Sequence, residues 1–306
     1  MEGMNIRPHL VLPVPATALL LMALLTSAPA AADVHLIDDS GQTLTLPAPA
    51  RRIVSLAPYT TEMLFAVGAG DRIVGATRYA DVPEAARKIP RIGDSNQLDL
   101  ERIVSLKPDV LVVWRNGSSE ALLDKLRSLR IPIFYSQPGR LAAIPAALIR
   151  FGQLAGTEAL AARAAAAFET RLEDLGSRYA NRPKVSVFYQ LWHQPLLTIN
   201  GEQQISDVIS LCGGVNIFAG RKPLVAPVTA EAVVSANPEA IVTVNEGPES
   251  EAGLDIWKKI PGLLATIRGN YILLNSDIVS LQSPRILDGA TALCINLEKV
   301  RAKRKP

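Results

Sequence analysis

One segment of this chain is repeated about 130 residues later. The sequence LERIVSLKPDVLVV at residues 100–113 returns as AEAVVSANPEAIVT at residues 230–243. Each copy places a glutamate, Glu101 or Glu231, near the start of a short helix, and a proline seven positions later ends that helix. Solenoid repeats recur about every 20 to 50 residues, so this spacing instead predicts two similar lobes with a cleft between them. Two equivalent glutamates suit a partner with two-fold symmetry.

The first 32 residues predict an exported protein. Arg7 precedes an almost wholly apolar stretch at residues 10–25, and Ala30 to Ala32 offer a cleavage site, which is the pattern of a secretory signal peptide. A membrane anchor is the alternative, but the apolar run is shorter than about 20 residues and contains two prolines. No cysteine near the cleavage site could carry a lipid. We therefore expect a soluble protein in the periplasm.

Length and charge limit the classes of function. Cleavage would leave about 270 of the 306 residues, enough for two lobes of ordinary size. The formal net charge is +3, and five basic residues are concentrated in the tail at 299–305. Since the rest of the chain is close to neutral, nothing indicates a nucleic-acid surface. We interpret the basic tail as a frayed, solvated helix end.

Short strands and helices alternate in two regions separated by a purely helical one. The alternation predicts α/β lobes with mostly parallel sheets, at residues 33–139 and 183–306. Residues 140–182 carry no strand signal, and their alanine-rich part at 157–180 has a very high helix propensity. One long rigid helix should therefore join the lobes, so a cleft between them would be largely pre-formed. The expected strands are 52–56, 72–76, 109–114, 131–135, 185–191 and 270–275. The expected helices are 60–67, 99–106, 119–129, 205–212, the helix of the second repeat, and a last helix from Ser283. Thr60 or Thr61 should cap the first of these helices.

The chain contains two cysteines, Cys212 and Cys294. In an oxidising compartment such a pair most simply forms one disulfide, here between two helices of the second lobe. Two free buried thiols are the alternative, whereas a redox centre would call for Cys-x-x-Cys spacing. Closing a loop of about 80 residues would contribute about 4 kcal/mol in the chain-entropy model.

Several short motifs identify a family. They are RIVSLAP at 52–58, YADVP at 79–83, LERIV at 100–104, WRNG at 114–117, LCGGVNIF at 211–218, and SD at 276–277 with SPRI at 283–286. Together they resemble periplasmic solute-binding proteins of the helical-backbone class, which serve ABC importers of cobalamin, ferric siderophores, haem and some metal ions. The resemblance extends over residues 52–300. The Trp-Arg, Cys-Gly-Gly and Ser-Pro-Arg segments and the cysteine pair are most similar to the cobalamin-binding branch.

The resemblance implies a partner for the repeated glutamates. In this family one glutamate on each lobe meets arginines on the two-fold-related permease subunits of an importer that also carries ATPase subunits. Glu101 and Glu231 would then be docking residues. From the residues alone, each glutamate could instead simply favour its helix N-terminus through the helix dipole. A monomeric receptor with no cofactor, carrying cobalamin or a related corrinoid as its ligand, is expected.

The family position of the cleft loops implies a set of ligand-binding residues. They are Pro58, Tyr59, Tyr79, Trp114, Arg115, Trp192, His193 and Asp277. Aromatic faces suit a large planar ligand whose orientation is set by a few polar groups. Core packing is the alternative for each of the two tryptophans.

Other ligands stay open at this point. Residues 93–96, 225–227 and 277–281 lack aromatic residues that cobalamin-binding relatives can carry in the cleft, which also suits a different corrinoid or another flat chelate. Haem would bind through Tyr59, Tyr79 or His193. A ferric siderophore would be held by Arg78, Arg115 or Arg285, although Arg285 could simply hold its own turn.

Metal-ion binding and catalysis are not expected. A metal-ion receptor of this class needs several histidine and carboxylate ligands, but His35 and His193 are the only histidines beyond the signal region. His193 could also serve as an axial ligand, though a hydrogen-bonding role is commoner for a lone histidine. No Gly-x-Ser-x-Gly, His-Glu-x-x-His or phosphate-loop motif occurs. The sequence therefore predicts a binding protein and no enzyme.

Overall fold

The computed structural model describes residues 33–304, except 95–96, 246–247 and 276–281. From Asp33 onward the chain forms one compact unit. No helix in these described ranges has the length and apolar character that crossing a membrane requires. The expected signal peptide with its cleavage site, and Asp277 of the expected ligand site, lie outside the described residues.

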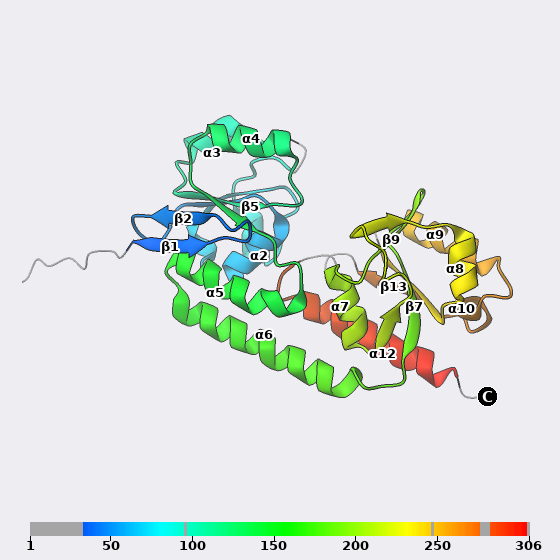
Figure 1. The fold of residues 1–306 in the computed structure, drawn as a ribbon. Helices are drawn as coiled ribbons and strands as arrows, with labels where there is room; N and C mark the ends of the chain where they lie inside the picture. The colour runs from blue at the N-terminus through cyan, green and yellow to red at the C-terminus, as the bar shows by residue number, and fades with distance from the viewer. Residues whose placement is uncertain (1–32, 95–96, 246–247, 276–281, 305–306) are drawn as a thin grey trace, which may run out of the picture. The chain divides into compact units, whose positions relative to one another are not determined.

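The first lobe is built on a four-stranded parallel sheet with the order β4-β3-β5-β6 (Figure 1). These strands are fully or nearly buried, which accounts for their continuous apolar sequences. A hairpin, β1 to β2, precedes the sheet. The elements are β1 (Val34–Ile37), β2 (Thr43–Leu46), β3 (Ile53–Ser55), α2 (Pro58–Ala66), β4 (Ile73–Ala76), α3 (Leu100–Ser105), β5 (Val110–Trp114), α4 (Glu120–Ser128) and β6 (Ile133–Ser136), with short 3-10 turns at Gly70–Arg72 and Glu84–Lys88.

The second lobe repeats this sheet. Its parallel strands have the order β10-β7-β12-β13, so in both lobes the second strand of the chain lies outside the first, and the third and fourth follow on the other side. A small antiparallel sheet, β11-β9-β8, was not expected from the sequence. The elements are β7 (Val185–Gln190), β8 (Trp192–His193), β9 (Leu196–Ile199), α7 (Gln204–Leu211), β10 (Gly214–Asn216), β11 (Val225–Pro227), α8 (Ala230–Ala236), β12 (Ala240–Asn245), α9 (Pro248–Lys258), α10 (Leu264–Ile267), β13 (Tyr271–Asn275) and α12 (Ile286–Ala302).

The repeated segment has the same local structure in both lobes. Each copy forms a short helix, α3 or α8, followed by the third strand of its sheet. The side chains of Asp99 and Thr229 cap these helices by accepting hydrogen bonds from backbone amides three residues later. Lys107 and Asn237 then take left-handed backbone conformations, with φ of 46° and 45°, directly before the proline. The repeat in the sequence is therefore a repeat in the structure.

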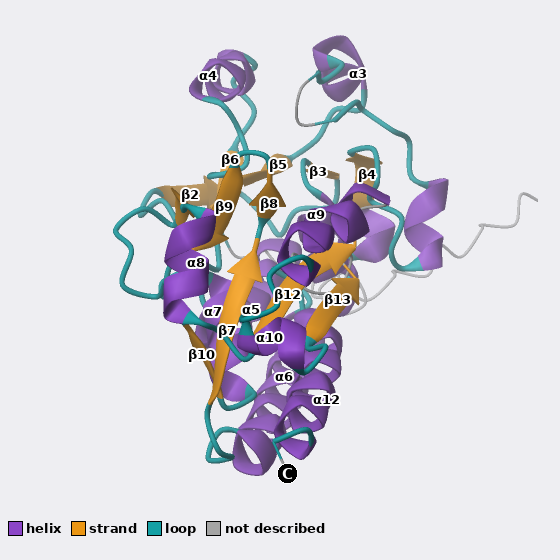
Figure 2. Cartoon of the chain, turned by 90° about the vertical axis from the view of Figure 1, so that its right-hand side faces the viewer, coloured by secondary structure: helices purple, strands orange, loops and turns teal. Residues whose placement is uncertain are grey.

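One long helix connects the lobes, as predicted. Helix α5 (Ile144–Ala155) ends at Gly156, whose φ of 61° is the left-handed conformation typical of a helix end. Helix α6 (Glu158–Tyr179) then runs for 22 residues and packs against α5 and α12 (Figure 2). Gly152 lets α5 approach α6 closely, because a Cβ at this position would overlap the side chain of Ala161. The predicted fold class, two α/β lobes joined by a backbone helix, is confirmed.

The first lobe helix starts earlier than predicted. Helix α2 begins at Pro58, a residue suited to the first helical turn because its missing N–H needs no partner there. The prediction that Thr60 or Thr61 caps this helix was wrong. Both threonines are buried within it, and their hydroxyl groups hydrogen-bond to Ser55 and to the carbonyl oxygen of Ala57.

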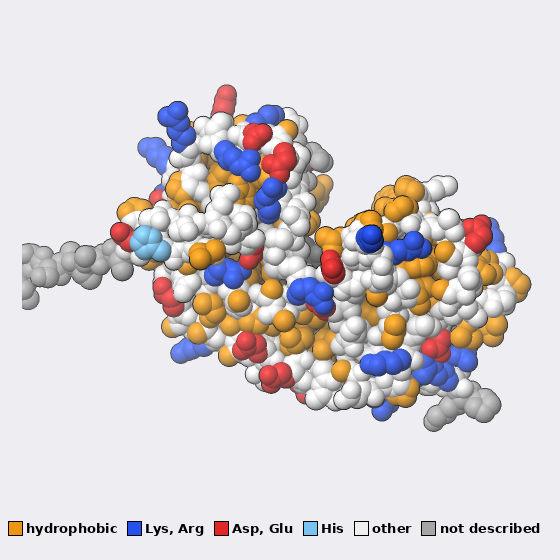
Figure 3. Space-filling view, in the orientation of Figure 1, with side chains coloured by type: hydrophobic (Ala, Val, Ile, Leu, Met, Phe, Trp, Pro, Cys, Tyr) orange, Lys and Arg blue, Asp and Glu red, His pale blue; other side chains and the backbone are white. Residues whose placement is uncertain are grey.

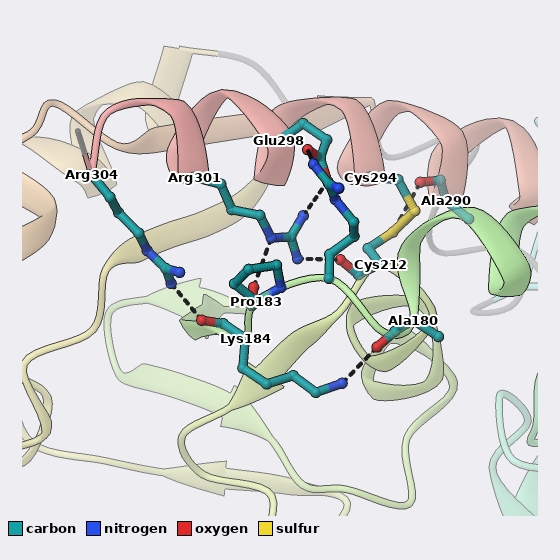
Figure 4. A network of polar contacts seen from close by, with 10 residues as sticks. Ala180, Pro183, Lys184, Cys212, Ala290, Cys294, Glu298, Arg301 and Arg304 are labelled. Atoms are coloured by element: carbon teal, nitrogen blue, oxygen red, sulfur yellow. Dashed lines mark hydrogen bonds and ion pairs between the residues drawn. A yellow bond between two sulfur atoms is a disulfide. The ribbon is translucent and has the colours of Figure 1, made fainter.

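The two arginines of the basic tail are packed onto the second lobe, so the prediction of a frayed, solvated helix end was wrong for them, whereas Lys299 and Lys303 are exposed. Arg301 is only 8% exposed and donates hydrogen bonds of 2.7 Å each to the carbonyl oxygens of Pro183 and Cys212 (Figure 4). Arg304 pairs with Glu239 and donates to the carbonyl oxygen of Lys184. The last turn of α12 is therefore hydrogen-bonded to the segment that follows α6.

The predicted disulfide between Cys212 and Cys294 is present. Cys212 follows α7, and Cys294 lies in the middle of α12, so the bridge joins these two helices as expected. Both residues are fully buried.

Candidate functional site

Two neighbouring cavities open at one edge of the first sheet and share part of their walls. The first has a volume of about 240 Å³ and the second about 330 Å³. Pro58 and Tyr79 line both of them. The other wall residues are Leu56, Ala57, Thr77, Arg78, Asp94, Trp114, Gly117 and Ser118 in the first cavity, and Glu62, Ala80, Asp81, Val82, Arg87 and Arg285 in the second.

Sheet topology brings three of the expected ligand-binding residues together here. Pro58 follows β3, Tyr79 follows β4, and Trp114 is the last residue of β5. Because these strands are parallel neighbours, their carboxyl ends meet at one edge, which is where open α/β sheets bind ligands. Three residues expected from the motifs therefore line the same cavity, and their role in ligand binding stays a prediction.

Tyr79 has an unusual backbone conformation. Its φ is 68°, a left-handed conformation that a bulky side chain rarely adopts. Its ring is 71% exposed at the junction of the two cavities. Both the backbone strain and the exposure of a large aromatic ring are costly, and such costs cluster at binding sites. Tyr79 therefore exposes a large aromatic side chain where the two cavities meet.

Tyr59 supports the cavity instead of lining it. Its side chain is buried, and its hydroxyl group donates a hydrogen bond of 2.8 Å to the carbonyl oxygen of Ser136. The ring meets that of Trp114 edge-on, with centroids 6.0 Å apart. Burial raises the pKa of Tyr59 far above its usual range. Because its hydroxyl group is buried, bonded to Ser136 and absent from the walls of both cavities, Tyr59 is poorly placed to bind the iron of haem. Its contribution is to hold Trp114 in the cavity wall.

Gly117 also fixes the position of Trp114. A Cβ at Gly117 would overlap the indole ring, so only glycine allows this loop to lie against it. We expect that Gly117→Ala will displace the ring and lower the free energy of unfolding by about 1–3 kcal/mol, as overpacking typically does. Near-ultraviolet circular dichroism and urea unfolding measure the two effects. Gly139→Ala is the matched control, since nothing lies within 4 Å of its added Cβ; equal behaviour of the two variants would contradict the prediction.

Three other expected ligand-binding residues that the structure describes, Arg115, Trp192 and His193, do not line these two cavities. Arg115 forms an ion pair of 2.6 Å with Glu120 at the start of α4. Trp192 and His193 form strand β8 of the small antiparallel sheet, with their ring centroids 5.5 Å apart. Trp192 is exposed, whereas His193 is partly buried and packs beside Gly253 of α9. Among the described residues, no group of three or more histidine, cysteine or acidic side chains could hold a metal ion.

The cavities also contain two arginines that the sequence suggested only for a ferric siderophore, and one glutamate, Glu62, that it did not suggest at all. Arg78 forms an ion pair of 3.5 Å with Asp94 in the first cavity. Glu62 of α2 faces the second cavity together with Arg285. A signal for Glu62 exists: once the helix is seen to start at Pro58, position 62 lies one turn later on the same face.

Both repeated glutamates are solvent-exposed in the first turn of their helices. Hydrogen bonds from its own backbone amide and then from Thr229 lower the pKa of Glu231, which keeps the carboxylate charged. Three residues after each glutamate comes an exposed valine, Val104 at 49% and Val234 at 38%. Each lobe therefore presents one carboxylate beside one apolar side chain. On the face shown in Figure 3, charges of both signs are interspersed, with no continuous basic patch there.

Comparisons with known proteins agree with this architecture. Residues 53–272 match the family model described as periplasmic binding protein. A vitamin B12-binding protein from Yersinia pestis (strain Pestoides F) is 37% identical over 258 residues, which is 84% of this chain and 90% of that relative. The crystal structure of the periplasmic vitamin B12 binding protein BtuF of Vibrio cholerae is 32% identical, with a TM-score of 0.74, over 84% of this chain and 99% of that one. The periplasmic heme-binding protein RhuT from Roseiflexus sp. RS-1 is 27% identical, with a TM-score of 0.70, over 82% of this chain and 99% of that one.

Proposed function

Because the chain belongs to the periplasmic binding protein family, we propose that it captures cobalamin or a related corrinoid and delivers it to an ABC importer of the inner membrane. Members of this family are binding proteins for transport and not enzymes. The observation that carries the proposal is the pair of aromatic faces, Trp114 and Tyr79, around a pre-formed cavity at the carboxyl edge of a parallel sheet. Cobalamin would be the transported ligand and not a cofactor.

The relatives support a corrinoid over other flat chelates. Relatives named for vitamin B12 binding reach 37% identity, whereas the heme-binding structure stands at 27%. Haem is the second candidate, because the exposed phenol of Tyr79 at the cavity mouth could serve as an axial ligand. Tyr59 is a poor haem ligand for the reasons given above. A ferric siderophore is less well supported, since Arg78 and Arg285 in the cavity walls each already pair with an acidic residue.

Titration with cyanocobalamin tests the proposal. The chain has three tryptophans, and Trp257 of α9 is fully buried, so a corrinoid over the cleft should quench the other two. We expect saturable quenching at about one ligand per protein, with a smaller amplitude in Trp114→Phe and in Trp192→Phe. Absence of quenching up to micromolar cyanocobalamin, with saturable binding of haem, would overturn the proposal that the ligand is a corrinoid. The proposal that the protein is a receptor would stand.

The remaining proposals concern delivery and organisation. Glu101 and Glu231 would dock on arginines of the two permease subunits. The neighbouring valines support a contact there, since both repeat positions leave an apolar side chain partly exposed to solvent. The receptor would act as a monomer, released into the periplasm by cleavage near Ala30 to Ala32. The lobes would comprise residues 33–139 and 183–306, with the helical segment 140–182 between them.

A further inference from the structure

A buried carboxylate in the first lobe holds two residues from near the end of the chain. Glu62 is only 7% exposed. Its Oε2 accepts a hydrogen bond of 2.6 Å from the hydroxyl group of Ser283, and its Oε1 accepts one of 2.8 Å from Nη1 of Arg285. Charge-assisted hydrogen bonds of this kind are about twice as strong as neutral ones. One side chain therefore ties α2 to the turn that starts α12.

The other end of α12 is fixed to the second lobe. Arg301 donates to the carbonyl oxygens of Pro183 and Cys212, and the disulfide joins Cys294 to Cys212 (Figure 4). Helix α12 is therefore a rigid part of the second lobe, and its first turn is anchored to the first lobe through Glu62.

This anchor is also part of a cavity wall. Glu62 and Arg285 both line the second cavity, beside Pro58 and Tyr79. Arg285 retains partial exposure, with a side chain 31% accessible, whereas that of Glu62 is 6% accessible. Since the guanidinium group is planar, fixing Nη1 fixes the direction of its other N–H donors. Arg87 and Asp81 line the same cavity. The carboxylate of Asp81 forms its ion pair with Arg91, with Nη2 of Arg91 2.7 Å from Oδ1 of Asp81, and not with Arg285.

From these contacts we infer that Glu62 is a positioning residue for ligand binding: it orients Arg285 toward oxygen atoms of the ligand, such as amide carbonyl groups, and joins the start of α12 to α2. This inference rests on the proposed function, because it assigns the second cavity to the polar rim of the same ligand. An arginine without its carboxylate would turn toward solvent. The same charge pair therefore affects both affinity and the contact between the lobes.

The variant Glu62→Gln tests this inference. The glutamine oxygen can still accept from Ser283, but the charge that holds Arg285 is lost. We expect the Kd for cyanocobalamin to rise at least about tenfold, as the loss of a charge-assisted hydrogen bond would produce. Arg285→Gln should have a similar effect, and the double variant should be no weaker than the worse single variant, because both changes remove one interaction. Glu84→Gln, an exposed acid in the same lobe, is the matched control and should leave the Kd unchanged.

A purely structural role would change the melting temperature and leave the Kd of the folded protein the same. Wild-type affinity in Glu62→Gln, or additive effects of the two single variants, would overturn the inference while leaving the proposed function intact. If the wild-type protein binds neither cyanocobalamin nor haem, the proposed function fails instead. In that case, hydrogen exchange at the amides of Ile286 and Leu287 tests whether Glu62 anchors the start of α12, which does not depend on a ligand. Faster exchange in Glu62→Gln supports the anchor, and unchanged exchange overturns it.

Discussion

Replacing Glu101 and Glu231 together by alanine should reduce transport at least about tenfold while leaving the Kd for ligand unchanged. The two carboxylates are exposed and lie on helices α3 and α8, each of which has a side-chain N-cap and precedes the third strand of its sheet. Opposite charges at such contacts act mainly on the rate of encounter and on orientation. Losing both leaves the partner's basic groups without a counter-charge, whereas the cavities keep their walls. Uptake of labelled cyanocobalamin by cells or by importer-containing vesicles measures the effect.

Glu158→Ala is the matched control for this experiment, because Glu158 is also an exposed glutamate in the first turn of a helix. It should leave transport unchanged. Raising the ionic strength should weaken docking of the wild-type protein far more than docking of the double variant. A loss of ligand affinity in the double variant would show that the glutamates belong to the ligand site and would contradict the docking proposal.

Among these variants, the one without the disulfide should have the lowest free energy of unfolding. The bridge closes a loop of 82 residues between two fully buried positions. In the chain-entropy model, a loop of this length contributes about 4–5 kcal/mol, and removal of native bridges typically costs about 2–5 kcal/mol. Cys212→Ala with Cys294→Ala should therefore lower the midpoint of guanidinium unfolding, followed by circular dichroism. Ligand affinity of the folded fraction should change little, because the cavity walls include neither cysteine.

The reducing agent dithiothreitol supplies the control. It should shift the unfolding midpoint of the wild-type protein toward that of the double variant, and should not affect the variant itself. Equal midpoints for the oxidised wild-type protein and the variant would contradict the prediction.

Most of the fold could be predicted because its signals are local. Buried parallel strands such as β5 and β12 are continuous apolar runs, and the alanine-rich run identifies α6 as a long helix. The small sheet β8-β9-β11 was missed because its strands have only two to four residues, too few to show a period. The packed tail was missed for another reason: Arg301 finds the carbonyl oxygen of Pro183 across 118 residues, and nothing local records that contact.

The residues of the candidate site also fall into those with a local sequence signal and those placed by long-range contacts. Pro58, Tyr79 and Trp114 could be selected because each lies at or shortly after the end of a recognisable strand within a motif. Glu62 was not selected, since its partners Ser283 and Arg285 lie 221 and 223 residues away and its helical position became clear only when the start of α2 was known. Residues that contact a ligand often stand in sequence motifs, whereas residues that hold them depend on tertiary contacts.

The place of α12 in the chain has a consequence for the order in which the protein matures. All four strands of the first sheet lie within residues 53–136, so that lobe can assemble early during synthesis, when domains form from the N-terminus onward. The second lobe needs Cys294 and Arg301 from the final helix before it can be completed. Losing even a short piece of the C-terminus would leave a chain with a finished first lobe and an open second one.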